Sequence, residues 1–127
     1  MIIATYPQKR TALCPACPGL GVRKRGHVAG VRWLTVRPEG SEGQELLLMD
    51  PAHSMLDATA AEQVRALVAK GALSPGVMAT SDCRADHRAL SAAGVQFLQE
   101  PATRPYGIEA VLRDDSGNWY SFTQRTA

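Results

Sequence analysis

The order of elements in the second half of this chain most constrains its fold. A strand at 77–80 is followed by a helix that Ser81 or Asp82 caps and that closes at Gly94. Three strands follow at 95–101, 108–113 and 118–124. The segment DDSGN between the last two is typical of a β-hairpin turn. This β-α-β-β-β order predicts an α+β fold.

The first half shows the same order in a weaker form. Strands are predicted at 1–6 and from Gly21 onward, and a hairpin is predicted to join 31–37 to 45–49. Pro15 and Pro18 interrupt the segment where the first helix should lie, because proline removes a backbone donor and clashes with the preceding turn. The sequence therefore predicts two βαβββ modules, the first with a shortened or broken helix.

A further helix is predicted between the halves, at 59–70. Thr59 and Glu62 have the spacing of a capping box, and Gly71 suits a left-handed C-terminal cap. Val64, Leu67 and Val68 fall on one predicted face. We expect a single domain over 1–127, with module one at about 1–52, a linker helix at 57–71 and module two at about 75–125.

The composition excludes few classes of protein. The 127 residues are 45% hydrophobic and 20% charged, with a net charge of +2, which is an ordinary globular balance. This charge does not indicate a nucleic-acid partner. No stretch is apolar and long enough for a membrane span, and the first residues lack the pattern of a signal peptide. With only three cysteines, a cytoplasmic location is expected.

Several short motifs in the C-terminal half occur in a specific order. They are GVQF at 94–97, EP at 100–101, PYG at 105–107 and DDSGN at 114–118. Together they resemble the C-terminal module of the vicinal-oxygen-chelate superfamily, which includes glyoxalases, bleomycin resistance proteins and extradiol dioxygenases. The similarity runs from about Leu20 to the end. It implies two modules whose curved mixed sheets enclose a cavity, in a protein that is often a homodimer.

The resemblance also implies where a metal would bind. Metal-using members carry a histidine on the first strand and a glutamate on the last strand of each module. The matching positions here hold Met1, Pro75 and Ser121, and only Glu45 remains as a candidate ligand. The three histidines lie elsewhere, at His27, His53 and His87. We therefore expect a metal-free member without a cofactor.

Two cysteines form the motif CPAC, at Cys14 and Cys17. This spacing fits a redox pair, half of a zinc site, or two free thiols in a loop. Cys83, on the predicted second helix, is more simply a small buried apolar residue.

Without a metal, the expected function is metal-independent binding of a small molecule, such as an antibiotic or an aromatic metabolite, in the sheet cavity. Such cavities combine aromatic walls with a few polar anchors. The expected ligand-binding residues are Trp33, Glu45, Trp119 and Ser121. Alternation along a strand places Trp119, Ser121 and Thr123 on one face. Both tryptophans also fit ordinary core packing.

Two other functions remain open. The chain fits a glyoxalase-like lyase or isomerase in which Glu45 or Glu109, or a bound divalent metal, supplies the chemistry. Nothing in the sequence pairs either glutamate with an orienting partner. The sequence is also compatible with an interaction protein whose sheet cavity has collapsed.

Overall fold

The structure is a computed structural model that describes residues 2–3, 20–38, 42–43, 45–74 and 76–126. Within these residues the chain forms, in order, β1 (Ile2–Ile3), β2 (Leu20–Val28), β3 (Val31–Pro38), β4 (Leu46–Met49), the short helix η1 (Pro51–His53), α1 (Ala58–Ala69), β5 (Gly76–Ala79), α2 (Cys83–Ala92), β6 (Gln96–Arg104), β7 (Gly107–Arg113) and β8 (Trp119–Arg125).

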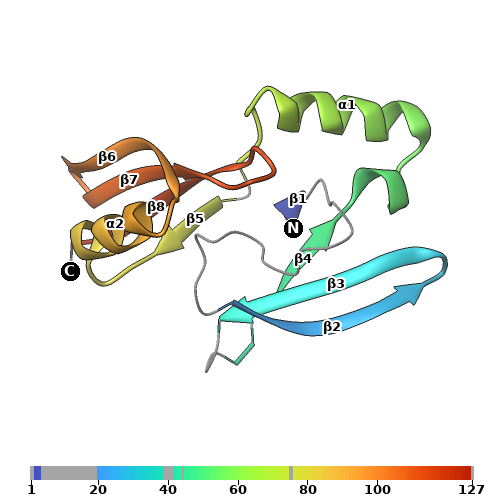
Figure 1. Ribbon diagram of the computed structural model, residues 1–127, viewed down its shortest axis with the longest axis horizontal. Coiled ribbons are helices and arrows are strands. Elements are labelled where there is room, and N and C mark those ends of the chain that lie inside the picture. The colour runs from blue at the N-terminus through green and yellow to red at the C-terminus, as the bar shows by residue number, and fades with distance from the viewer. Residues whose placement is uncertain (1, 4–19, 39–41, 44, 75, 127) are drawn as a thin grey trace.

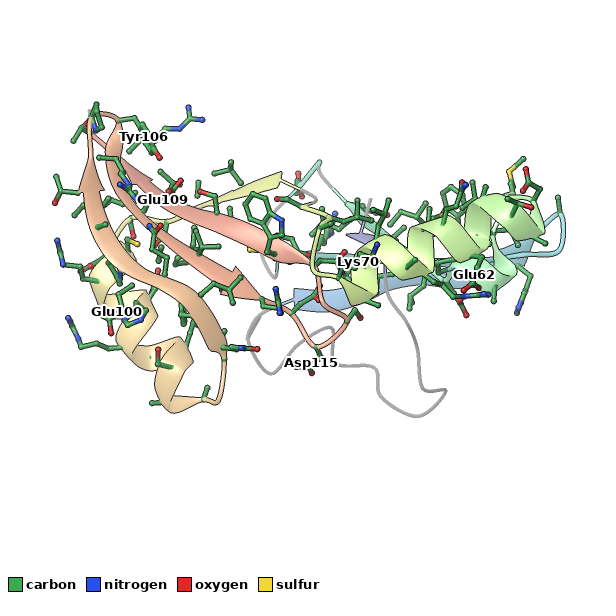
Figure 2. All side chains as sticks on the ribbon, turned by 90° about the horizontal axis from the view of Figure 1, so that it is seen from above. Glu62, Lys70, Glu100, Tyr106, Glu109 and Asp115 are labelled. Atoms are coloured by element: carbon green, nitrogen blue, oxygen red, sulfur yellow. The ribbon has the colours of Figure 1, made fainter. Side chains whose placement is uncertain are left out.

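The strands form two sheets with the same internal order. Sheet A has the order β1-β4-β3-β2 and sheet B the order β5-β8-β7-β6. The first pair of each order is parallel and the other pairs are antiparallel. Figures 1 and 2 show the sheets side by side. The α+β class with two mixed sheets is thus confirmed, while the broken first helix and the CPAC motif lie outside the described residues.

Strand β6 extends further than the sequence predicted. Its expected end was Pro101, but the ladder with β7 continues from Ala102 to Arg104. A register shift between Gln99 and Ala102 leaves Pro101 outside the pairing. Because β6 is an edge strand, the missing proline N–H costs no ladder hydrogen bond. The expected hairpin of β3 and β4 is confirmed by the pairing of Leu34 with Leu48.

Helix α1 begins earlier than its sequence signal indicated. Asp57 is the N-cap, because its carboxylate accepts a hydrogen bond from the Ala60 N–H at 2.8 Å. The predicted Thr59 cap is therefore wrong. Val68 is buried, but Leu67, predicted on the same face, is 41% exposed. Gly71 follows the helix in the left-handed conformation, as predicted.

Helix α2 covers one face of sheet B (Figure 1). Asp82 caps it by accepting a hydrogen bond from the Ala85 N–H at 2.9 Å. Cys83 is fully buried, and the His87 ring meets the Phe97 ring edge-on, with centroids 4.4 Å apart. His87 is thus a packing residue. A core cluster joins both halves of the chain: Leu34, Val36, Leu48, Leu90, Val95, Leu112 and Tyr120.

No helix in the described part of the chain is long and apolar enough to cross a membrane.

Candidate functional site

The face of sheet B that points away from α2 carries the candidate site. On β7 and β8, alternate side chains point to this face, and the register places Glu109 opposite Thr123, Val111 opposite Ser121, and Arg113 opposite Trp119. We call this surface the open face of sheet B. It consists of Glu109, Val111, Arg113, Trp119, Ser121 and Thr123.

Glu109 is the centre of a hydrogen-bond network on this face. The Ser121 hydroxyl donates to Glu109 Oε2 at 2.7 Å and lies 2.9 Å from the Thr123 hydroxyl. Ser121 is 8% exposed and Thr123 is 4% exposed. Buried hydroxyl groups need hydrogen-bond partners, and the carboxylate supplies one. The orienting partner that the sequence did not reveal for Glu109 is therefore Ser121.

A second hydroxyl reaches the same carboxylate from the β6–β7 turn. The exposed Tyr106 phenol donates to Glu109 Oε2 at 3.0 Å, and Figure 2 shows the two side chains together at the end of sheet B. Arg104 Nε lies 3.9 Å from Glu109 Oε1. The hydrogen bond to Glu109 raises the pKa of the Tyr106 phenol above its ordinary value, because ionisation would remove the donor and place a second negative charge beside the carboxylate.

This hydrogen bond can be tested by titration. We expect Glu109→Gln to lower the pKa of Tyr106 towards its ordinary value, since the negative charge beside the phenol is removed. Ultraviolet difference spectra of the variant and the wild type would measure tyrosinate formation, with Tyr106→Phe identifying the contribution of this residue. Identical Tyr106 titrations in the wild type and Glu109→Gln would contradict the contact.

Of the other two predicted ligand residues, Trp33 lies on β3 of sheet A and Glu45 immediately precedes β4. Glu45 accepts a hydrogen bond from the Thr35 hydroxyl at 2.7 Å, so this glutamate also has an orienting partner. Trp33 is 40% exposed. Trp119 and Ser121 share the open face of sheet B, whereas Trp33 lies on β3 of sheet A and Glu45 lies next to β4 of that sheet. The structure therefore places two of the four residues on sheet B and the other two at sheet A.

A hollow of about 400 Å³ lies at one end of sheet B. It is bordered by the last turn of α1, the α2–β6 turn and the β7–β8 turn. Figure 2 shows Lys70, just after α1, and Asp115, in the β7–β8 turn, on neighbouring elements. Arg113 borders both the hollow and the open face, but none of the four predicted ligand residues lines the hollow. Its described walls carry no aromatic side chain, which makes it a poorer site for an aromatic ligand than the open face.

The described residues do not fit the divalent metal that the fold family implies. Ser121 stands where a metal-ligating glutamate is expected, and its hydroxyl is engaged by Glu109. Within the described ranges, no group of three or more His, Cys, Asp or Glu side chains is placed to hold a metal ion. Carboxylate and imidazole groups are the donors that such an ion needs.

Sequence reasoning named Glu109 only as a catalytic alternative and missed Tyr106. The sequence nevertheless contains the information that places Glu109 beside Ser121, in the register of the β7–β8 hairpin. If the turn at 114–118 closes the hairpin, counting outward places 113 opposite 119, 111 opposite 121 and 109 opposite 123. That count brings Glu109 and Ser121 onto one face. No comparable count places the Tyr106 ring, because its direction depends on the β6–β7 turn.

The chain is similar to several solved structures. UcmS2 is 41% identical, with a TM-score of 0.75, and the match covers 83% of this chain and 79% of that chain. TnmS3, an antibiotic binding protein from Streptomyces sp. CB03234, is 25% identical, with a TM-score of 0.61, over 85% of this chain and 77% of that chain.

A glyoxalase/bleomycin resistance protein from the same Streptomyces strain is 26% identical, with a TM-score of 0.56, over 84% of this chain and 80% of that chain. No protein-family model and no curated protein matches the sequence. The fold, the shared strand order of the two sheets and these sequence identities all indicate the same family. The chain belongs to the glyoxalase/bleomycin resistance protein/dioxygenase superfamily, which is the vicinal-oxygen-chelate superfamily.

Proposed function

We propose that this protein binds and sequesters an aromatic small molecule, such as an antibiotic or an aromatic metabolite, on the open face of sheet B. The observation that carries the proposal is the half-buried indole of Trp119, on the same face as the hydrogen-bonded pair of Ser121 and Glu109. The 25% identity to TnmS3, an antibiotic binding protein, supports it.

This surface has the composition of a ligand site. An indole offers a rigid apolar plane on which a flat ring can stack, and such contacts add about 0.5–1.5 kcal/mol to the burial of apolar area. Val111 adds apolar surface beside it, and the Glu109 network adds fixed polar groups. A few oriented polar groups on an apolar wall give a pocket its specificity.

The proposal includes a homodimer. Next to the open face of sheet B, Val77 on β5 pairs with Ser121 and is 62% exposed, while Trp33 in sheet A is 40% exposed. A second copy laid over these sheets would bury this apolar surface and close the site. Such burial is the main favourable contribution to protein association.

The proposed function is tested by calorimetric titration of the wild type with aromatic antibiotics and common aromatic metabolites. At least one compound is expected to bind and to be recovered unchanged, which distinguishes sequestration from turnover. Trp119→Ala is expected to weaken that binding about tenfold or more, because the stacking plane is lost. Met55→Ala is a matched control, since Met55 is 91% exposed and lies outside the site.

The fold of each variant would be checked by circular dichroism. If no compound in either class binds the wild type, the proposed function is wrong. If Trp119→Ala folds and binds as the wild type does, Trp119 is not part of the site. Conversion of the bound compound into a product would instead support the lyase or isomerase alternative.

A further inference from the structure

We infer that Glu109 makes the open face of sheet B selective for aromatic ligands that carry a hydrogen-bond donor, of the phenol class, and that it excludes anionic ligands. This inference rests on the proposed function and adds the chemical class of the ligand. It comes from the way in which the two carboxylate oxygens are used.

The two oxygens of Glu109 have different partners. Oε2 accepts two hydrogen bonds, from the hydroxyls of Ser121 and Tyr106. The contact that the described residues make with Oε1 is Arg104 Nε at 3.9 Å, which is too long for a hydrogen bond. The Glu109 side chain is still 18% exposed. Oε1 is therefore an acceptor that a ligand hydroxyl can use.

The carboxylate is held in position before any ligand arrives. Ser121 is buried, donates to Oε2 and also contacts the buried Thr123 hydroxyl. Tyr106 holds the same oxygen from the turn. Both hydrogen bonds hold the carboxylate through Oε2, which also limits the positions that Oε1 can take. An acceptor that does not have to be reordered on binding gives more affinity and more specificity than a mobile one.

The spacing of side-chain rows on this face matches a ligand of about two fused rings. Glu109 Oε2 lies 2.7 Å from the Ser121 hydroxyl, so the carboxylate lies beside the Ser121 row, one row from the Trp119 row on this face. Successive side chains on one face of a strand are about 7 Å apart. A two-ring aromatic that stacks on Trp119 can therefore place a ring hydroxyl at Glu109.

The charge of Glu109 determines which ligands are excluded. A phenol donates a hydrogen bond to the carboxylate, and a hydrogen bond to a charged group is stronger than one between neutral groups. A ligand carboxylate offers no donor at pH 7 and is repelled at short range. Arg104 offsets little of this repulsion, because its side chain is 42% exposed and its charge is screened by solvent.

The experiment uses three matched probes at pH 7: 2-naphthol, 2-methoxynaphthalene and 2-naphthoate. We expect the wild type to bind 2-naphthol at least about tenfold more tightly than the other two. In Glu109→Gln, Ser121 and Tyr106 can donate to the amide oxygen, which turns the amide NH₂ towards the ligand. The preference for 2-naphthol is then expected to disappear. Glu100→Gln is the control, because Glu100 is an exposed carboxylate on β6 (Figure 2).

The wild-type series tests the inference even if Glu109→Gln does not fold. If the wild type binds 2-naphthol and 2-methoxynaphthalene equally, Glu109 does not select ligands that carry a hydrogen-bond donor. The proposed function is then decided separately, by the titrations with antibiotics and metabolites. If none of the three probes binds, the inference is overturned, whereas the antibiotic and metabolite titrations still decide the proposed function. A preference for 2-naphthol that persists in folded Glu109→Gln would also overturn the role of Glu109.

Discussion

Gly107→Ala is expected to lower the free energy of unfolding by about 3–5 kcal/mol, since it adds backbone strain to a steric clash. Gly107 opens β7 with a φ of +141°, a conformation that residues with a side chain rarely adopt. A Cβ atom at this position would lie 2.0 Å from the Gln124 carbonyl oxygen and 3.0 Å from the Arg125 Cα atom. Both are backbone atoms of β8, so the strands themselves would have to separate.

Thermal unfolding followed by circular dichroism measures this effect. A loss of this size should lower the melting temperature by roughly 10–20 °C in a chain of this length. Gly26→Ala is the matched control, because Gly26 has no atom within 4 Å of its would-be Cβ and its φ is not positive. Equal melting temperatures for the two variants would contradict the close packing of β7 against β8 at Gly107.

Local signals in the sequence predicted most of the second half of the fold. The DDSGN turn and the alternation of side chains predicted the β7–β8 hairpin, and Ser81 or Asp82 was predicted to cap α2, where Asp82 is the cap. These features depend on neighbouring residues, which is why they can be read from the chain. The start of α1 was missed because Asp57 and Thr59 both carry capping side chains, and the actual cap depends on where the chain leaves η1.

The candidate site was predicted only in part. Strand alternation correctly grouped Trp119, Ser121 and Thr123 on one face. Glu109 was separated from this group because the hairpin register was not counted across the turn. Tyr106 was missed for a different reason. Its contact with Glu109 depends on the conformation of the β6–β7 turn, where Gly107 closes onto Gln124, a residue 17 positions further along the chain.

Asp114→Ala is expected to destabilise the protein by about 3–5 kcal/mol, an effect as large as that of Gly107→Ala, because it removes a buried acceptor that several donors share. Asp114 is 8% exposed, at the start of the β7–β8 turn. Its Oδ1 accepts hydrogen bonds from the backbone N–H groups of Ser116 and Asn118, each at 2.9 Å. Its Oδ2 accepts from the Asn118 amide at 2.9 Å and from the Tyr120 phenol at 3.2 Å.

These four bonds join the turn to the core. Asn118 is fully buried and Tyr120 belongs to the core cluster. The substitution therefore removes the Asp114 carboxylate from the buried donor groups of these two residues. Asp114→Asn should recover only part of the loss, because an amide has one accepting oxygen and its NH₂ group would face a donor. Urea unfolding would measure the free energies, with the exposed Asp115→Asn expected to stay within about 0.5 kcal/mol of the wild type. If Asp114→Ala were as stable as Asp115→Asn, the turn would not depend on the buried carboxylate, and the β7–β8 register that brings Glu109 to Ser121 would have to be fixed by strand pairing alone.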